Sequence, residues 1–327
     1  MSGIAAQQSA AQPGDLDAHY GRVVRALVEN RVVPLLGAGV NLSQRVPGAS
    51  WRIGEDLPSG SELAEYLADA FFYPGQELRS DLLRVSQYAA ATDGTGPLYD
   101  ELRNLFHRDY KPTMVHEFFA TLPKRLEPIR AKGLRPEVPF PLIVTTNYDD
   151  ALECAFVEAE EPFDVVWYVA DGSERGKFWH RAYDGAATLI ERPDEYDELS
   201  FEQRTVILKI HGAVDRQDKV RDSYVITEDH YIDYLTKTEL KQLVPVELVA
   251  KLMSSRFLFL GYSMQDWNLR VILHRIWGRQ PLTYKSWAIQ RDPPEIERKL
   301  WSSRGVEVLD IPLDRYVKEL WRRLDAA

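Results

Sequence analysis

The sequence predicts an α/β protein built around a doubly wound parallel sheet. Short, fully apolar segments of strand length alternate along the chain with longer segments whose apolar residues recur at helical spacing. Continuously apolar strands are typical of a parallel sheet, because helices cover both of its faces. The chain of 327 residues is long enough for one large domain of this kind that contains a sizeable insertion.

The N-terminal part of the chain is expected to form a tail, a helix and the first strand. Residues 1–14 are rich in alanine, glutamine and serine, which predicts a disordered tail. Apolar residues at helical spacing from Asp15 onward predict a helix, and the apolar segment 32–36 predicts a strand. Residues 42–58 contain several prolines and glycines, so we expect a long irregular loop, a kind of segment that is often functional.

A helical module is expected between the first and second strands. Ser59 and Glu62 have the spacing of a capping box, which predicts a helix that runs to Phe72. Further helical patterns cover residues 81–91, 97–108 and 113–122. Because the module (about 59–125) is too long for a simple crossover between strands, we expect an inserted helical small domain.

The second half of the chain returns to alternating strands and helices. Residues 170–203 are charged, contain glycine and show no clear period, so they are expected to form an insertion or a lid. The expected strands are 141–144, 165–168, 206–210, 257–260, 287–289 and 306–309. The expected helices are 150–160, 228–236, 238–254, 265–277 and 314–324.

Four short segments directly follow four of these strands. They are Gly37-Ala38-Gly39-Val40-Asn41, Thr145-Thr146-Asn147-Tyr148-Asp149, His211-Gly212 and Gly261-Tyr262-Ser263. In a doubly wound sheet, ligands bind outside the carboxyl ends of the strands, so the four segments are expected to converge on one site. Glycine turns beside an amide, a carboxylate and a histidine suit a nucleotide whose glycosidic bond is attacked.

The glycine turn after the first strand matches half of a dinucleotide-binding fingerprint. Glycines at positions 37 and 39 permit a tight turn and a close approach of backbone N–H groups to phosphate. Leu42 occupies the third position of the fingerprint, and no strand with an acidic end follows soon after. The sequence therefore does not indicate an ordinary dehydrogenase, and a pair of glycines alone is often only a turn.

Three polar side chains in these segments are candidates for the chemistry. Asn147 offers a carboxamide donor and acceptor, and Asp149 offers an acceptor. Either Asp149 or Asp150 is expected to cap the helix that begins at Ala151. His211 titrates near neutral pH and can take a proton from a ribose hydroxyl, although a single histidine is more often structural.

Composition excludes several classes of protein. The net charge of −10 argues against a general nucleic-acid binder, and no apolar segment is long enough to span a bilayer. The start of the chain lacks the features of a signal peptide, so a cytoplasmic location is expected. Cys154 is the single cysteine, which rules out an intrachain disulfide and a cysteine-based zinc cluster. We expect a buried thiol at Cys154 and no bound metal.

In their order along the chain, the four segments resemble the motifs of sirtuins. The closest resemblance is to the sirtuin-like domain of bacterial antiphage defence proteins, and it extends from about residue 20 to 325. It implies one sirtuin-like domain over 15–327, with a Rossmann-like large part, a helical small part and NAD in the cleft between them. In that branch the domain cleaves NAD to nicotinamide and ADP-ribose and thereby depletes the infected cell of NAD, a form of abortive infection.

The resemblance also implies roles for individual residues. Asn147 would position the nicotinamide ribose and the attacking water, and His211 would act as general base or polarise the ribose hydroxyls. Asp149 would hold the ribose or the nicotinamide. Gly37, Ala38 and Asn41 would lie against the phosphates, and Gly261 and Ser263 against the adenosine side. The full expected NAD-binding set is Gly37, Ala38, Gly39, Asn41, Thr146, Gly261, Tyr262 and Ser263.

Two departures from the sirtuin pattern favour NAD hydrolysis over deacetylation. Sirtuin deacetylases carry four zinc-binding cysteines, whereas this chain contains only Cys154. They also carry a Gly-Ile-Pro-Asp-Phe-Arg-type loop, where this chain has Val-Pro-Gly-Ala-Ser-Trp at 46–51. The expected function is an NAD glycohydrolase. An NAD-dependent protein deacylase and a non-catalytic subunit that binds NAD or ADP-ribose are the alternatives.

The resemblance implies control by other proteins as well. An enzyme that destroys NAD must be restrained until it is needed, and the sequence shows no fused sensor domain, so regulation is expected from self-assembly or from a separate protein. Expected partners are further copies of the chain and either a HerA-type hexameric ATPase or a short Argonaute. No direct contact with nucleic acid is expected.

Overall fold

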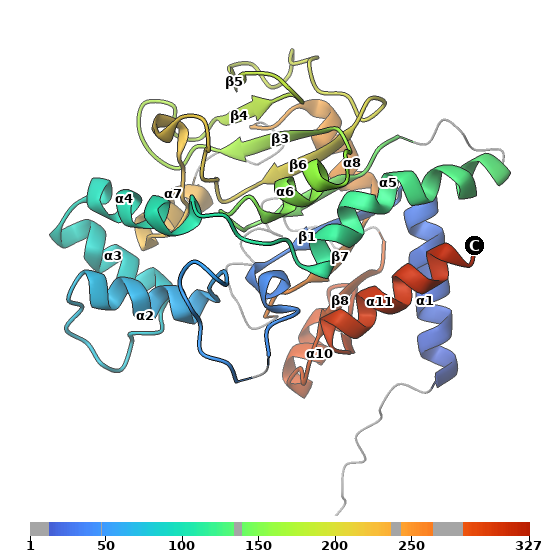
Figure 1. The fold of residues 1–327 in the computed structure, drawn as a ribbon, viewed down its shortest axis with the longest axis horizontal. Coiled ribbons are helices and arrows are strands. Elements are labelled where there is room, and N and C mark those ends of the chain that lie inside the picture. The colour runs from blue at the N-terminus through green and yellow to red at the C-terminus, as the bar shows by residue number, and fades with distance from the viewer. Residues whose placement is uncertain (1–12, 47, 134–138, 237–242, 264–283) are drawn as a thin grey trace, which may run out of the picture.

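One mixed sheet forms the centre of the protein (Figure 1). The computed structural model describes residues 13–46, 48–133, 139–236, 243–263 and 284–327. Within these residues the strands are β1 (Val32–Leu36), β2 (Leu142–Thr145), β3 (Phe163–Tyr168), β4 (Phe178–Arg181), β5 (Ala187–Ile190), β6 (Thr205–Lys209), β7 (Arg256–Leu260), β8 (Ser286–Gln290) and β9 (Val306–Asp310).

The strand order confirms the predicted doubly wound architecture. The sheet runs β5-β4-β3-β6-β2-β1-β7-β8-β9, and all neighbouring strands from β3 to β9 are parallel. After β1 the chain builds the sheet first toward β3 and later, from β7, in the opposite direction. This change of direction at β1 is the topological switch point of a Rossmann-like sheet, with β6 inserted between β2 and β3.

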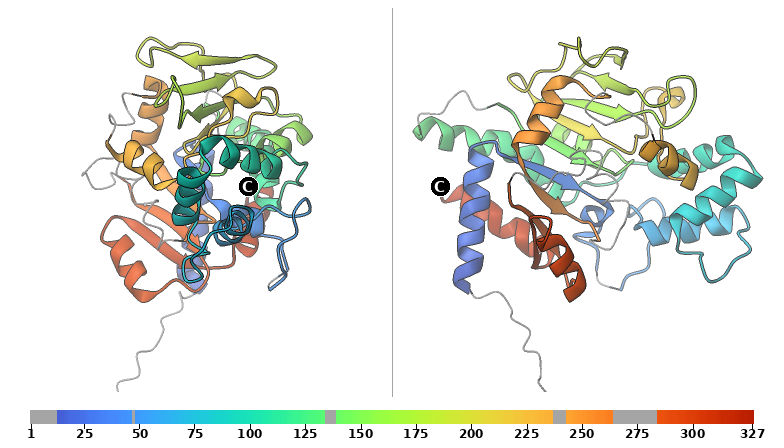
Figure 2. Two further views of the ribbon diagram at one scale, coloured as in Figure 1. Left: turned by 90° about the vertical axis from the view of Figure 1, so that its left-hand side faces the viewer. Right: turned by 180° about the vertical axis from the view of Figure 1, so that it is seen from behind.

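Helices cover both faces of the sheet (Figure 2). Side chains alternate along β1: Val33 and Leu35 belong to the apolar core on one face, and Val32 and Leu36 to the core on the other. The first face is covered by α7 (Glu228–Thr236), α8 (Val246–Ser254) and α10 (Glu295–Ser302). The second is covered by α1 (Pro13–Val28), α5 (Met114–Lys132), α6 (Ala151–Glu158) and α11 (Leu313–Asp325). Burial on both sides explains why the strand sequences are continuously apolar.

The expected helical module stands beside the sheet and has an apolar core of its own. It consists of α2 (Gly60–Ala70), α3 (Leu82–Thr92) and α4 (Thr95–Phe106). The fourth segment expected in the module (about 59–125), residues 113–122, belongs to α5, which packs against the sheet instead. The capping box that begins α2 is present: Ser59 Oγ accepts from the Glu62 N–H at 3.2 Å, and the Ser59 N–H donates to Glu62 Oε2 at 2.8 Å.

Helix α5 differs from the expected segment 113–122, because it continues to Lys132 through Pro123 and Pro128. Each proline removes a backbone hydrogen bond and usually ends a helix. Here Leu122 and Leu126 are buried against the sheet together with α1 and α11. The apolar contacts across that face outweigh the lost hydrogen bonds.

The segment 170–203 contains two strands, β4 and β5, which extend the sheet in antiparallel fashion beyond β3. These strands lie at the sheet edge and bury only part of their residues, so their apolar pattern is weak. Helix α10 was not expected, because it is short and half of its residues are charged. The expected helix 265–277 and most of the expected tail lie outside the described residues. Among the described helices, none combines the length and the apolar character needed to cross a bilayer.

The free energy of unfolding depends on pH through His116, which caps the start of α5. The Thr113 N–H donates to His116 Nδ1 at 3.0 Å. Burial, together with the charge of Lys209, lowers the pKa of His116 to about 3. Below its unfolded pKa of about 6.5 the unfolded chain takes up a proton that the folded chain does not bind. The free energy of unfolding therefore falls as the pH decreases from 7 to 5.

We expect the substitution His116→Gln to weaken this pH dependence. Glutamine keeps an acceptor for the cap but does not titrate. The decrease in the free energy of unfolding between pH 7 and pH 5 should be smaller by about 2 kcal/mol than in the wild type. Urea unfolding at the two pH values measures the difference, and an unchanged decrease in the variant would contradict the role of His116.

Candidate active site

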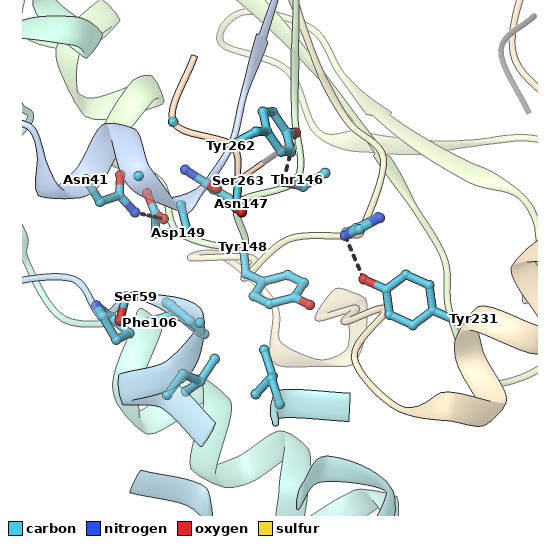
Figure 3. Close-up of a pocket in the computed structure, with 18 residues that line it drawn as sticks. Asn41, Ser59, Phe106, Thr146, Asn147, Tyr148, Asp149, Tyr231, Tyr262 and Ser263 are labelled. Atoms are coloured by element: carbon cyan, nitrogen blue, oxygen red, sulfur yellow. Dashed lines mark hydrogen bonds between the residues drawn. The ribbon is translucent and has the colours of Figure 1, made fainter. Parts of the chain in front are cut away.

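A cavity of about 370 Å³ opens at the carboxyl ends of β1, β2, β6 and β7 (Figure 3). This volume is within the range of small-molecule sites. The strand-end segments contribute Ala38, Gly39, Asn41, Thr146, Asn147, Tyr148, Asp149, His211, Gly261, Tyr262 and Ser263 to its lining. The helical module and the loop before it contribute Pro58, Ser59, Gly60, Leu63, Leu82 and Phe106, and α7 contributes Tyr231. The structure thus brings together every predicted site residue except Gly37, which does not line the cavity.

The glycines hold two turns in direct contact. The Gly37 N–H donates to Leu260 O and the Gly39 N–H donates to Gly261 O, both at 2.9 Å. A Cβ atom on Gly39 would lie 2.7 Å from Gly261 O, and Gly261 itself has φ +73°. These positions therefore require glycine so that the turn after β1 can pack against the turn after β7. Both N–H groups are bonded within the protein.

Asn147 is fixed between two strand ends. Its backbone N–H donates to Thr145 Oγ1 at 3.0 Å, and its side-chain Nδ2 lies 3.4 Å from Gly37 O. The residue is 9% exposed and lines the cavity. The carboxamide is therefore held in one orientation, with its nitrogen toward the turn after β1.

Asp149 combines a structural contact with a place on the cavity wall. Its Oδ1 accepts from the Ala151 N–H at 3.1 Å, so this aspartate, rather than Asp150, bonds the start of α6. Its Oδ2 accepts from Asn41 Nδ2 at 2.9 Å. Burial raises the pKa of Asp149, while the nearby Lys209 charge and the bond from Asn41 act in the opposite direction. Both carboxylate oxygens are thus held in place before any ligand binds.

Asn41 leaves one acceptor without a partner. While its nitrogen donates to Asp149, its Oδ1 is buried and has no hydrogen-bond partner within the described part of the chain. Asn41 also lines the cavity. A buried acceptor of this kind favours a ligand with a hydroxyl donor.

Lys209 is a buried cation that the sequence analysis missed. It is fully buried at the end of β6, where its Nζ donates to Asp149 O and forms an ion pair with Glu153 Oε1 at 2.6 Å. The bond to Asp149 O fixes the backbone of the segment that carries Asn147 and Asp149. A single lysine inside the apolar strand 206–210 was the available signal, because lysine is almost never fully buried unless it is paired.

His211 is uncharged in this environment. It is 5% exposed, and burial lowers its pKa to about 3. A neutral imidazole has one nitrogen that can accept a hydrogen bond or a proton. Its Nδ1 lies 3.4 Å from the hydroxyl of Tyr231, a second cavity residue that sequence reasoning missed because it lies in α7, away from the four motifs.

Two tyrosines of the motifs connect the site to its surroundings. Tyr262 OH donates to Leu36 O at 3.1 Å and lies 3.0 Å from Thr146 Oγ1. Tyr148 OH donates to Val225 O at 2.7 Å, and its ring contacts Phe106 of the helical module. Ser263 is exposed at the cavity, and the expected helix 265–277 that follows it lies outside the described residues.

An arginine fastens the helical module to the strand ends. Arg216 forms a two-point ion pair with Asp150, at 2.6 and 2.9 Å. The same guanidinium donates to the backbone carbonyls of His107 and Arg108 after α4. The loop before the module is also tied down, because Arg45 bonds Glu62 Oε1 at 2.5 Å and Leu57 O at 2.8 Å. The cavity wall from the module is therefore held in a defined position.

The described residues contain no group of three or more histidine, cysteine, aspartate and glutamate side chains arranged to hold a metal ion. Cys154 lies in α6 and is half-buried. Burial raises the pKa of its thiol to about 12, which makes it a poor nucleophile.

We expect Lys209→Met to destabilise the protein by about 3 kcal/mol, because it leaves the Glu153 carboxylate without its buried partner. The double variant Lys209→Met/Glu153→Gln removes both charges and should recover a large part of this loss. Urea unfolding of the wild type and of the two variants measures the effect. Equal instability of the single and double variants would show that the ion pair is not the cause.

Comparison with known proteins identifies the family. A model of the SIR2-like domain family matches residues 141–309, just over half of the chain, and this range includes three of the four motif segments. A search of curated proteins finds no match. Among solved structures, a histidine-to-tyrosine mutant of Sir2 with a p53 peptide and NAD is 14% identical, with 94% of this chain and 99% of that chain covered and a TM-score of 0.37. On the strength of the family match, the chain belongs to the SIR2-like domain family.

Proposed function

We propose that the protein is an NAD glycohydrolase that cleaves NAD to nicotinamide and ADP-ribose. The observation that carries the proposal is the convergence of Asn147, Asp149 and an uncharged His211 on one cavity at the strand ends. The cavity lies at the switch point of a doubly wound sheet, where nucleotides bind in such folds. Membership of the SIR2-like family favours NAD as the nucleotide.

The proposed reaction does not need a general acid. The bond between C1′ of the ribose and the nicotinamide nitrogen breaks, and nicotinamide leaves as a neutral molecule that needs no proton. Water forms the new C1′–O bond and releases one proton. The transition state carries positive charge at C1′, so fixed dipoles and acceptors around the ribose accelerate the reaction.

The site residues fit these requirements. The carboxamide of Asn147, held in one orientation, would position the ribose and the attacking water. His211, neutral at physiological pH, would accept a proton or a hydrogen bond from a ribose hydroxyl or from the water. The fixed carboxylate of Asp149 would hold the ribose or the nicotinamide.

The remaining lining residues would hold the rest of the NAD molecule. Ala38 would lie against the phosphates. Asn41, whose nitrogen is already bonded to Asp149, presents an acceptor oxygen, so we assign it to a ribose hydroxyl rather than to a phosphate. Residues on the adenosine side would be Thr146, Gly261, Tyr262 and Ser263. Gly37 and Gly39 would act through the backbone geometry of the turn.

We expect Asn147→Ala and His211→Ala each to reduce nicotinamide release at least about 100-fold, because each removes a group that acts on the reacting ribose. Chromatography of the products measures release, and circular dichroism confirms that the variants are folded. Asn104→Ala, on the exposed surface of α4, is the matched control and should retain wild-type activity. Wild-type turnover by either site variant would contradict the assignment.

The same assay separates the alternative functions. EDTA is present throughout, because no metal is assigned to the reaction. A deacylase would release nicotinamide only when an acetylated peptide is added. A non-catalytic subunit would bind NAD or ADP-ribose without any nicotinamide release. The single cysteine, which cannot form the four-cysteine zinc site of the deacetylases, favours hydrolysis.

We further propose that the enzyme acts in the cytoplasm in antiphage defence, and that its activity is low until a partner binds. Unrestrained hydrolysis would deplete the NAD of the host. A closed form lowers the apparent affinity for NAD in proportion to the fraction of open molecules. A HerA-type hexameric ATPase or a short Argonaute that binds the open form would shift the population and activate the enzyme.

We expect the isolated chain to be an oligomer with low activity that rises when such a partner is added. Light scattering gives the oligomeric state, and nicotinamide release in the same sample gives the activity. A fully active monomer that does not respond to any partner would contradict this regulation, while leaving the catalytic assignment in place.

A further inference from the structure

Tyr231 contacts the candidate base from outside the four motifs. Its hydroxyl lies 3.4 Å from His211 Nδ1. Figure 3 labels Tyr231 and draws the hydrogen bond at its hydroxyl as a dashed line. The two rings meet edge to face, with centroids 5.4 Å apart and an interplanar angle of 89°. Tyr231 is 6% exposed and lines the same cavity. The tyrosine therefore limits both the position of the imidazole ring and the hydrogen bonding of Nδ1.

Helix α7, which carries Tyr231, is placed by contacts near its first turn. The N–H groups of Ile226 and Thr227 both point at His230 Nδ1, at 3.3 and 3.4 Å. Thr227 Oγ1 accepts from the His230 N–H at 3.2 Å. The hydroxyl of Ser86, a fully buried residue of α3, lies 2.8 Å from Ile226 O and 2.6 Å from Leu82 O of its own helix. Gln87 of α3 also accepts from the Asp229 N–H of α7 at 3.1 Å. The helical module therefore positions Tyr231 against His211.

Resting on the function proposed above, we propose that Tyr231 is a positioning residue that fixes the orientation and the tautomer of His211. A neutral imidazole carries one proton on either of its two nitrogens, and the hydrogen bond made by one nitrogen decides which tautomer is present. In the proposed state the Nδ1–H of His211 donates to the tyrosine oxygen, which places the acceptor lone pair of the ring on Nε2. A base in a single tautomer and a single orientation accepts its proton without first rearranging.

The substitution Tyr231→Phe tests the bond itself, independently of activity. Phenylalanine keeps the ring contact and removes only the hydroxyl. In protein labelled with ¹⁵N-histidine, the imidazole nitrogen shifts of His211, assigned by their absence in His211→Ala, report the tautomer. We expect one neutral tautomer in the wild type and a mixture in Tyr231→Phe. The matched control is Tyr99→Phe, which removes a hydroxyl 3.4 Å from Tyr224 O and outside the cavity, and should leave the His211 signals unchanged.

Kinetics test the consequence of the bond. We expect kcat of Tyr231→Phe to fall about tenfold while KM changes less than about twofold, because the hydroxyl acts on the base rather than on the substrate. Tyr99→Phe should match the wild type. A single tautomer with unchanged kcat in Tyr231→Phe would overturn the proposal, and a change in KM alone would assign the hydroxyl to substrate binding instead. If the wild type does not hydrolyse NAD, the function fails, but the tautomer measurement still decides whether Tyr231 fixes His211.

Discussion

The contact between the turn after β1 and the turn after β7 determines the geometry of the whole site. Gly39 donates to Gly261 O at 2.9 Å, and a side chain at Gly39 or Gly261 would overlap with the backbone of the other turn. β1 is an interior strand at the switch point of the sheet, so this contact joins the two halves of the doubly wound fold where the cavity opens. Asn147 bonds to Gly37 O in the turn after β1, and Tyr262 bonds to Leu36 O at the end of β1.

Two ion pairs next to the cavity fix the segment that carries the polar groups of the site. Lys209 supports the backbone of Asp149 and is itself neutralised by Glu153. Arg216 pairs with Asp150 and bonds the end of α4, so the same short segment is fixed to the helical module. Such buried or partly buried ion pairs cost desolvation and add little stability, but they restrict the segment to one arrangement. Electrostatic catalysis requires polar groups that are already oriented before the reaction, and the ion pairs orient the segment that carries them.

The helical module lines one side of the cavity and also positions a residue on another side. Leu63, Leu82 and Phe106 give the cavity an apolar side opposite the polar strand ends. Through Ser86 the module also fixes the start of α7, and with it Tyr231 beside His211. Burial keeps this imidazole neutral, so in the proposed reaction the residue would act as an acceptor throughout the physiological pH range. The inserted helices and the sheet thus form the candidate site together.

The sequence by itself determined the alternation of strands and helices, which depends on the local spacing of apolar residues. It also determined the capping box at Ser59, which depends on hydrogen bonds within one turn of helix. The four segments at the strand ends could be placed together because parallel strands end at the same edge of a sheet. Only the tertiary structure decided that β6 lies between β2 and β3, that 170–203 extends the sheet, and that α5 continues through two prolines. Likewise, only packing between distant segments explains why Gly37 bonds to the end of β7 and Gly39 to the turn after it, and how Lys209 and Tyr231 come to their places near the site. Each of these depends on residues that are far apart in the chain, and their contacts follow from burial and steric fit rather than from any local pattern.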